Sequence, residues 1–157
     1  MQPVSRETVN AFYQAFASRS AARIAPFVDD DVEWTISGPV DVLQFCGVHR
    51  GKQAVLRLFD RLVPETFQVT GINPEALLVD GDRAAMLCTV TGVKGPPKRT
   101  ISYRLSQFSR FRDGKIFEFC SIIDSFDAAE QILGHAIDVT QRTSLLDRAS
   151  AGDLISV

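Results

Sequence analysis

Asp124 is the carboxylate of this 157-residue chain with the best placement for acid–base chemistry. It lies in an apolar run with Ile123 and Phe126, and burial there would raise its pKa toward a value suited to proton transfer. The same position, at the end of a predicted strand, also suits a helix N-cap whose carboxylate accepts hydrogen bonds from backbone amides. Asp124 is therefore both a catalytic candidate and a candidate capping residue.

Gln107 and Trp34 are candidates for ligand contact. Strand alternation places Gln107 on one face with mostly apolar side chains, namely Ile101, Tyr103, Leu105, Ser109 and Phe111. A single amide among them either contacts a ligand or is a core amide whose hydrogen bonds are satisfied within the protein. Trp34, the only tryptophan, either lines a cavity or packs in an ordinary core.

The remaining reactive side chains predict no metal, disulfide or cofactor site. Cys46, Cys88 and Cys120 are widely spaced and form no CxxC pattern, which is typical of reduced, buried thiols. His49 titrates near neutral pH, but its place beside Arg50 after a loop favours a surface role.

Charge and hydropathy exclude several classes of partner. Lys and Arg number 17 against 19 Asp and Glu, without a run of five like charges, so no basic surface for nucleic acid or anionic lipid is predicted. No apolar stretch approaches the length of a membrane span, and the N-terminus does not resemble a signal peptide. We expect a cytoplasmic protein that binds neither nucleic acid nor membrane.

Helices are predicted first along the chain. Apolar spacing predicts a helix over residues 5–18 with Ser5 as N-cap, and a short helix capped by Ser20 that ends at an acidic turn over 29–31. A strand is predicted over 32–37, an irregular loop over 38–50, and a third helix over 51–62.

Strands dominate the rest of the chain. They are predicted over 67–72, 76–79, 83–93, 100–111 and 116–123, before a short helix over 128–133. Three helices followed by an antiparallel meander describe an α+β fold with helices on one face of a sheet. We predict one domain over 1–137 and a polar tail over 138–157, which is either a frayed terminus or an arm on a partner subunit.

The composition is unusual in its 11 Phe against 2 Tyr and 1 Trp, which indicates either a phenylalanine-rich core or an apolar pocket. Phe12 and Phe16 fall on the inner face of a predicted helix, and Phe108 on the outer face of a strand. Phe117 and Phe119 would also face outward if the last strand contained no bulge.

Several segments, in their order and spacing, resemble the SnoaL-like and ketosteroid isomerase-like branch of the nuclear transport factor 2-like superfamily. They are VNAFYQAF, IAPFVDDDVEWTISGP, VHRGKQAVLRLFDRL, SQFSRFRDGKIFEF and IIDSFDAAEQILG. The resemblance implies a cone-shaped fold, in which a curved antiparallel sheet wraps around three N-terminal helices, with a short C-terminal helix and a cavity at the wide end. It also implies a homodimer that pairs through the outer face of the sheet.

The catalytic residues of known relatives do not carry over. At the positions that match the tyrosine, base and oxyanion acid of ketosteroid isomerases, this chain has Phe12 (with Tyr13 beside it), Thr35 and Gln107. Threonine is no general base near neutral pH, and glutamine donates hydrogen bonds without a tunable pKa. The strand that matches the arginine and aspartate of limonene epoxide hydrolases, residues 87–91, contains neither.

These arguments predict a protein that binds a small, mostly apolar organic molecule in its cone. Asp124 is its catalytic candidate if IDSFD matches the ending of the limonene epoxide hydrolases, which requires a gap of three residues in the strand. Without that gap, Ser121 takes the pocket position instead. The predicted ligand contacts are Tyr13, Phe16, Trp34, Thr35, Phe59, Gln107 and Ser121. The activity would be cofactor-independent acid–base chemistry of an isomerase, cyclase or hydratase. The alternatives are a noncatalytic binding or accessory module and a protein-interaction domain.

Overall fold

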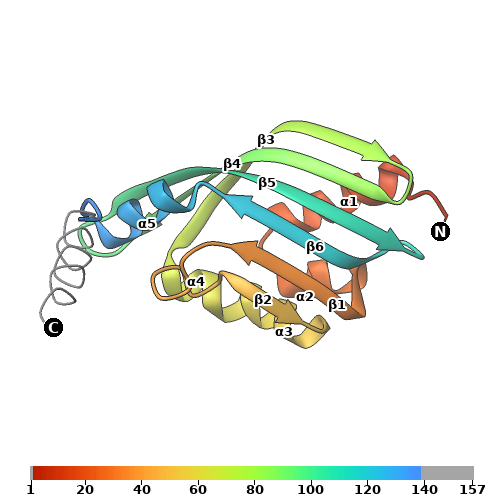
Figure 1. Cartoon of the computed structure of the whole chain (residues 1–157), viewed down its shortest axis with the longest axis horizontal. Helices are drawn as coiled ribbons and strands as arrows, with labels where there is room; N and C mark the ends of the chain where they lie inside the picture. Colours follow the sequence, from red (N-terminus) through yellow and green to blue (C-terminus); the bar gives the residue numbers. More distant parts are fainter. Residues whose placement is uncertain (1, 139–157) are drawn as a thin grey trace, which may run out of the picture.

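A computed structural model describes residues 2–138, which form a curved six-stranded sheet with helices on its concave side (Figure 1). The strands lie side by side in the order β2 (Gly47–Arg50), β1 (Val28–Ser37), β6 (Lys115–Ile123), β5 (Arg99–Arg112), β4 (Arg83–Lys94) and β3 (Gln68–Asp80). Neighbouring strands are antiparallel except β1 and β6, which run parallel. The predicted α+β fold is confirmed, and the parallel pair is an addition to it.

The first two helices form as predicted because each has a serine N-cap. Ser5 accepts a hydrogen bond of 3.0 Å from the Thr8 amide at the start of α1 (Arg6–Ala17). Ser20 accepts one from the Arg23 amide at the start of α2 (Ala21–Ile24), and the 3₁₀ turn η1 (Ala25–Phe27) follows. Both predicted helices are confirmed.

Two predictions about residues 29–50 were wrong. Residues 29–31 lie within β1 rather than in a turn, at the place where the pairing of β1 with β6 is irregular, between Val28 and Glu33. Part of the predicted loop is the strand β2, which pairs along β1. Pairing with a distant neighbour, which local composition does not encode, stabilises both stretches.

The third helix is longer than predicted, and its hydrogen-bonding pattern changes from α to π and back along its length. It consists of α3 (Lys52–Arg57), the π-helical turn η2 (Leu58–Leu62) and α4 (Val63–Thr66). The predicted strands over 67–72 and 76–79 are one continuous strand, β3. Pro74 interrupts the register with β4 only locally, since a residue without an amide hydrogen is tolerated on an edge strand.

Phe12 lies at the centre of the core between α1 and the sheet and has no exposed surface. Its ring centroid is 4.9–6.5 Å from those of six other aromatic side chains, which are Tyr13, Phe16, Phe27, Trp34, Phe111 and Phe119. The phenylalanine excess therefore forms mainly a core, and part of that core also lines a pocket.

A bulge in β6 decides which of its aromatic residues face inward. Arg110 pairs with Glu118 and Phe111 with Ile116, so Phe117 is the unpaired extra residue. Phe119 is consequently buried, whereas Phe117 lies beneath the guanidinium groups of Arg110 and Arg112, each 5.0 Å from its ring centroid.

The C-terminal helix α5 (Ser125–Leu133) begins three residues before the predicted start and lies along one end of β5 (Figure 1). The Gln131 side chain donates to the backbone carbonyl of Ser102 and accepts from its amide, both at 2.7 Å. The Arg99 guanidinium donates to the carbonyls of Gln131 and Ile132. Apart from Asp138, the predicted tail over 138–157 lies outside the described residues.

Candidate functional site

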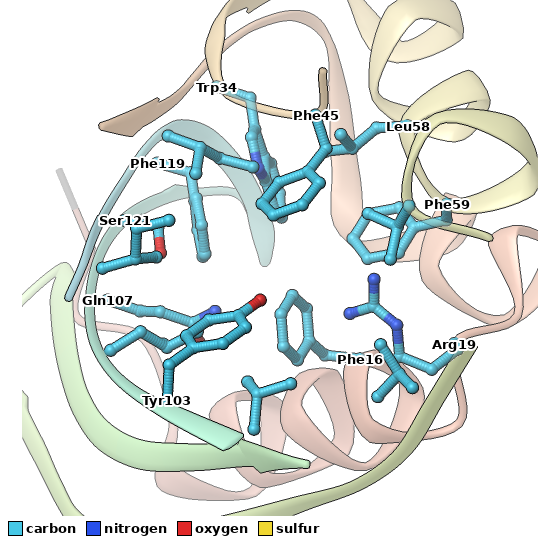
Figure 2. A pocket seen from close by; sticks show the side chains of 16 residues that line it. Phe16, Arg19, Trp34, Phe45, Leu58, Phe59, Tyr103, Gln107, Phe119 and Ser121 are labelled. Carbon is cyan, nitrogen blue, oxygen red and sulfur yellow. The ribbon is translucent and has the colours of Figure 1, made fainter. Parts of the chain in front are cut away.

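A pocket opens on the concave face of the sheet, beside the end of α1 and the segment from α3 to α4 (Figure 2). Most of the 16 residues that line it are apolar, among them Phe16, Trp34, Phe45, Phe59 and Phe119. The free volume of this pocket is about 40 Å³. An apolar cavity that binds benzene has ~150 Å³, so a ligand with a ring requires side chains to move.

Gln107 and Ser121 bring polar atoms to this apolar wall. They are register partners on β5 and β6, and alternation turns both toward the pocket. Gln107 is only 1% exposed, and its Oε1 has no hydrogen-bond partner in the described part of the chain. An unsatisfied buried acceptor costs about 1–3 kcal/mol, so a donor brought by a ligand would be favourable there.

Trp34 adds an unsatisfied donor. Its ring stacks on Phe119, its register partner across β1 and β6, with centroids 3.6 Å apart and planes 14° from parallel. The Phe59 ring packs edge-on against the Trp34 ring, with the two centroids 5.9 Å apart. The buried indole Nε1–H has no acceptor within residues 2–138, although a buried indole usually finds one.

Arg19 brings a positive charge to the pocket, and the sequence arguments did not predict it. It follows the end of α1 with a left-handed backbone (φ 58°). Its guanidinium carbon lies 5.1 Å from the Phe16 ring centroid and 4.6 Å from that of Phe59. Burial lowers the pKa of Arg19 to about 10, so the group remains charged at neutral pH.

The Tyr103 hydroxyl in the pocket wall and the Cys46 and Cys88 thiols are protonated at neutral pH. Burial raises the pKa of the Tyr103 hydroxyl in the pocket wall well above its usual value, and the charge of Arg19 opposes this only in part. Burial also raises the pKa of the Cys46 thiol to about 12 and that of Cys88 to about 11. Tyr103 can therefore donate a hydrogen bond, and neither thiol forms a nucleophilic thiolate.

Five of the predicted site residues line the pocket: Phe16, Trp34, Phe59, Gln107 and Ser121. Two others are not among the lining residues. Thr35 alternates with Trp34 along β1 and so faces the other side of the sheet. Tyr13 points away from the pocket to the neighbourhood of Ser109, and burial raises its pKa to about 12.

Asp124 also lies outside the pocket. It is exposed at the N-cap position of α5, and its side chain makes no capping hydrogen bond. Its backbone amide instead donates to the carbonyl of Arg104 at 3.0 Å, which continues the pairing of β6 with β5. Ser121, and not Asp124, lines the pocket.

Strand periodicity could have identified two more lining residues. Tyr103 and Leu105 share the inward face of β5 with Gln107, as the alternation predicted. No local signal marks Arg19, because its place in the pocket depends on how the end of α1 meets α3 and η2. In the described range of 2–138, no cluster of three His, Cys, Asp or Glu residues could hold a metal ion. No helix in that range is long and apolar enough to cross a membrane.

Comparison with known proteins identifies the family of this chain. The model of the SnoaL-like domain matches residues 9–119, which is more than half of the chain. The chain belongs to the SnoaL-like family. This SnoaL-like protein resembles a proposed isomerase from Rhodopseudomonas palustris, with 29% identity over 81% of this chain and 93% of that one, and a TM-score of 0.70.

More distant solved structures share the fold. This SnoaL-like protein matches an NTF2-like protein from Burkholderia xenovorans at 22% identity, over 80% of this chain and 93% of that one, with a TM-score of 0.66. It matches an LEH-like epoxide hydrolase from M. tuberculosis at 17% identity, over 90% and 94% of the two chains, with a TM-score of 0.63. No curated protein sequence matches it.

Proposed function

We propose that this SnoaL-like protein binds a small, mostly apolar organic molecule in the pocket of its cone. The observation that carries the proposal is a pair of buried polar atoms, Trp34 Nε1 and Gln107 Oε1, that have no hydrogen-bond partner within residues 2–138 and lie in a mostly apolar wall. A ligand that supplies an acceptor to the first and a donor to the second would satisfy both. Such convergent polar groups in an apolar cavity are typical of small-molecule sites.

Binding without catalysis is the function that this geometry supports best. An isomerase or hydratase of the acid–base type needs a group that accepts a proton near neutral pH, within hydrogen-bond reach of the ligand. The pocket wall has Arg19 and Tyr103 as its titratable side chains, and both are protonated there. The favoured interpretation is a ligand-binding or accessory module.

Isomerase-type chemistry is the second candidate, because the relative from Rhodopseudomonas palustris at 29% identity is a proposed isomerase. Asp124 would be its acid–base group, as the sequence predicts. Because Asp124 is exposed and outside the pocket, this role requires a substrate that extends to the start of α5. Turnover that is lost in Asp124→Asn would support it.

Trp34 provides a direct test of binding. It is the only tryptophan and lines the pocket, so its emission reports occupancy. A neutral aromatic probe, 3-phenylpropanamide, is expected to change the emission, and Ser121→Val should weaken its binding about three- to tenfold by removing a hydroxyl and adding bulk. The measurement is a fluorescence titration of both proteins.

Thr35→Val is the matched control for Ser121→Val. Thr35 is next to Trp34 in the chain but faces the other side of the sheet, so its replacement should leave the affinity unchanged. Equal affinities in all three proteins would place the probe outside the pocket. No emission change in the wild-type protein would contradict the proposed function, and native mass spectrometry of the purified protein would then search for a retained molecule.

We also propose that two copies pair through the outer face of the sheet. Leu78, Phe108 and Ile122 are exposed there by 69%, 51% and 51%, respectively, although each is a large apolar side chain. Light scattering is expected to give the mass of a dimer for the wild-type protein. Phe108→Glu should convert it to a monomer, because a carboxylate on each copy would be desolvated and would meet apolar side chains. A monomeric wild-type protein would contradict the pairing.

A further inference from the structure

Arg19 is a cation without an anionic partner in the described part of the chain. Among residues 2–138, its guanidinium forms no salt bridge and lies instead over the rings of Phe16 and Phe59. Other arginines of the same chain are paired, such as Arg104 with Glu75 at 2.6 Å and Arg110 with Glu118 at 3.0 Å. Contact with two aromatic faces stabilises a cation, but it does not neutralise the charge.

Arg19 lies where the pocket borders a second hollow of the protein. A φ of 58° after the end of a helix is a position where glycine is favoured, and an L-residue there costs about 1 kcal/mol or more. Arg19 also lines a hollow outside the pocket, and Phe59, Val63 and Val69 line both spaces. A molecule that enters from the hollow therefore meets the guanidinium first.

Tyr103 supplies a second donor close to this charge. Figure 2 shows its hydroxyl turned toward the middle of the pocket, on the side that the Arg19 guanidinium faces. The hydroxyl makes no hydrogen bond within the described residues, and burial keeps it protonated at neutral pH. The guanidinium has only donors, and the phenol adds an O–H that can donate. Together in apolar surroundings they are complementary to a carboxylate.

We propose that the ligand of this pocket is an organic carboxylate, with its carboxylate on Arg19 and Tyr103 and its apolar body between Phe16 and Trp34. The inference rests on the proposed function, because it assigns a chemical class to the molecule bound there. It also accounts for the small free volume. Arg19 is a long, flexible side chain, and its movement from the aromatic rings to a carboxylate would open the space that a ring needs.

Two ligands that differ only in charge test this assignment. We expect 3-phenylpropanoate to bind the wild-type protein at least about tenfold more tightly than 3-phenylpropanamide, as measured by Trp34 emission and by calorimetry. Arg19→Gln should abolish the preference for the acid, because it should weaken binding of the acid at least about tenfold and binding of the amide much less. Arg19→Lys should retain part of the preference, since it keeps the charge but loses the planar fork.

Arg23→Gln is the matched control, because Arg23 is an exposed arginine on α2 outside the pocket wall. It should keep the full preference for the acid. Equal affinities of the acid and the amide in the wild-type protein would overturn the carboxylate assignment and leave the apolar pocket standing. A preference that persists in Arg19→Gln would overturn it as well.

A different result of the same titrations would contradict the proposed function itself. If neither ligand changes Trp34 emission, the pocket binds no such molecule, and both proposals fail together. If Arg19→Gln does not fold, the affinities of the wild-type protein and of Arg19→Lys for the acid and the amide still test the carboxylate assignment. A preference for the acid that is the same in both proteins would mean that the carboxylate binds elsewhere.

Discussion

Phe12→Ala is expected to lower the free energy of unfolding by about 3–5 kcal/mol. The side chain is wholly buried, and it contacts rings from α1, η1, β1, β5 and β6. Its removal leaves a cavity that rigid aromatic neighbours cannot fill, so the cost should lie near the upper end of this range. Urea denaturation followed by circular dichroism measures the change.

Phe126→Ala is the control for this substitution. Phe126 is 53% exposed on α5, so the same chemical change should cost less than about 1 kcal/mol. A loss below about 2 kcal/mol for Phe12→Ala would contradict the prediction, and it would mean that the aromatic core collapses into the space.

Gln107→Leu is expected to have opposite effects on stability and on binding. Leucine has nearly the same volume and removes an amide whose buried Oε1 has no partner among residues 2–138. The free energy of unfolding should therefore rise by about 1 kcal/mol. The pocket would also lose a hydrogen-bonding group on its inner wall. Affinity for 3-phenylpropanamide should therefore fall by about 1–2 kcal/mol, or roughly tenfold.

Urea denaturation and the Trp34 titration measure the two effects on the same protein samples. Gln53→Leu, at an exposed position on α3, should change neither quantity appreciably. If Gln107→Leu destabilised the protein by 1 kcal/mol or more, the amide would have to be satisfied in solution by a buried water. A gain in stability together with a loss of affinity would indicate that the wall of this pocket is built for binding at the expense of stability.

Residues close together in the sequence determined much of this fold. The serine caps and apolar spacing of α1 and α2 act within a few residues, and the structure has both helices where the sequence predicts them. Alternation along β5 predicted the inward face that carries Gln107, because a strand has a fixed period of two. Prediction failed at β2 and at the acidic part of β1, where the stabilising partner is a distant strand.

The sequence by itself determined the fold class, the family resemblance and the shortage of polar groups in an apolar interior. Only the tertiary structure decided which of those groups face one another. Trp34 rather than Thr35 lines the pocket because the pairing of β1 with β6 sets which face is concave, and the bulge at Phe117 turns Phe119 inward. Arg19 reaches the pocket because a single left-handed residue ends α1 beside Phe59. Such placements depend on contacts between segments far apart in the chain, which no local pattern records.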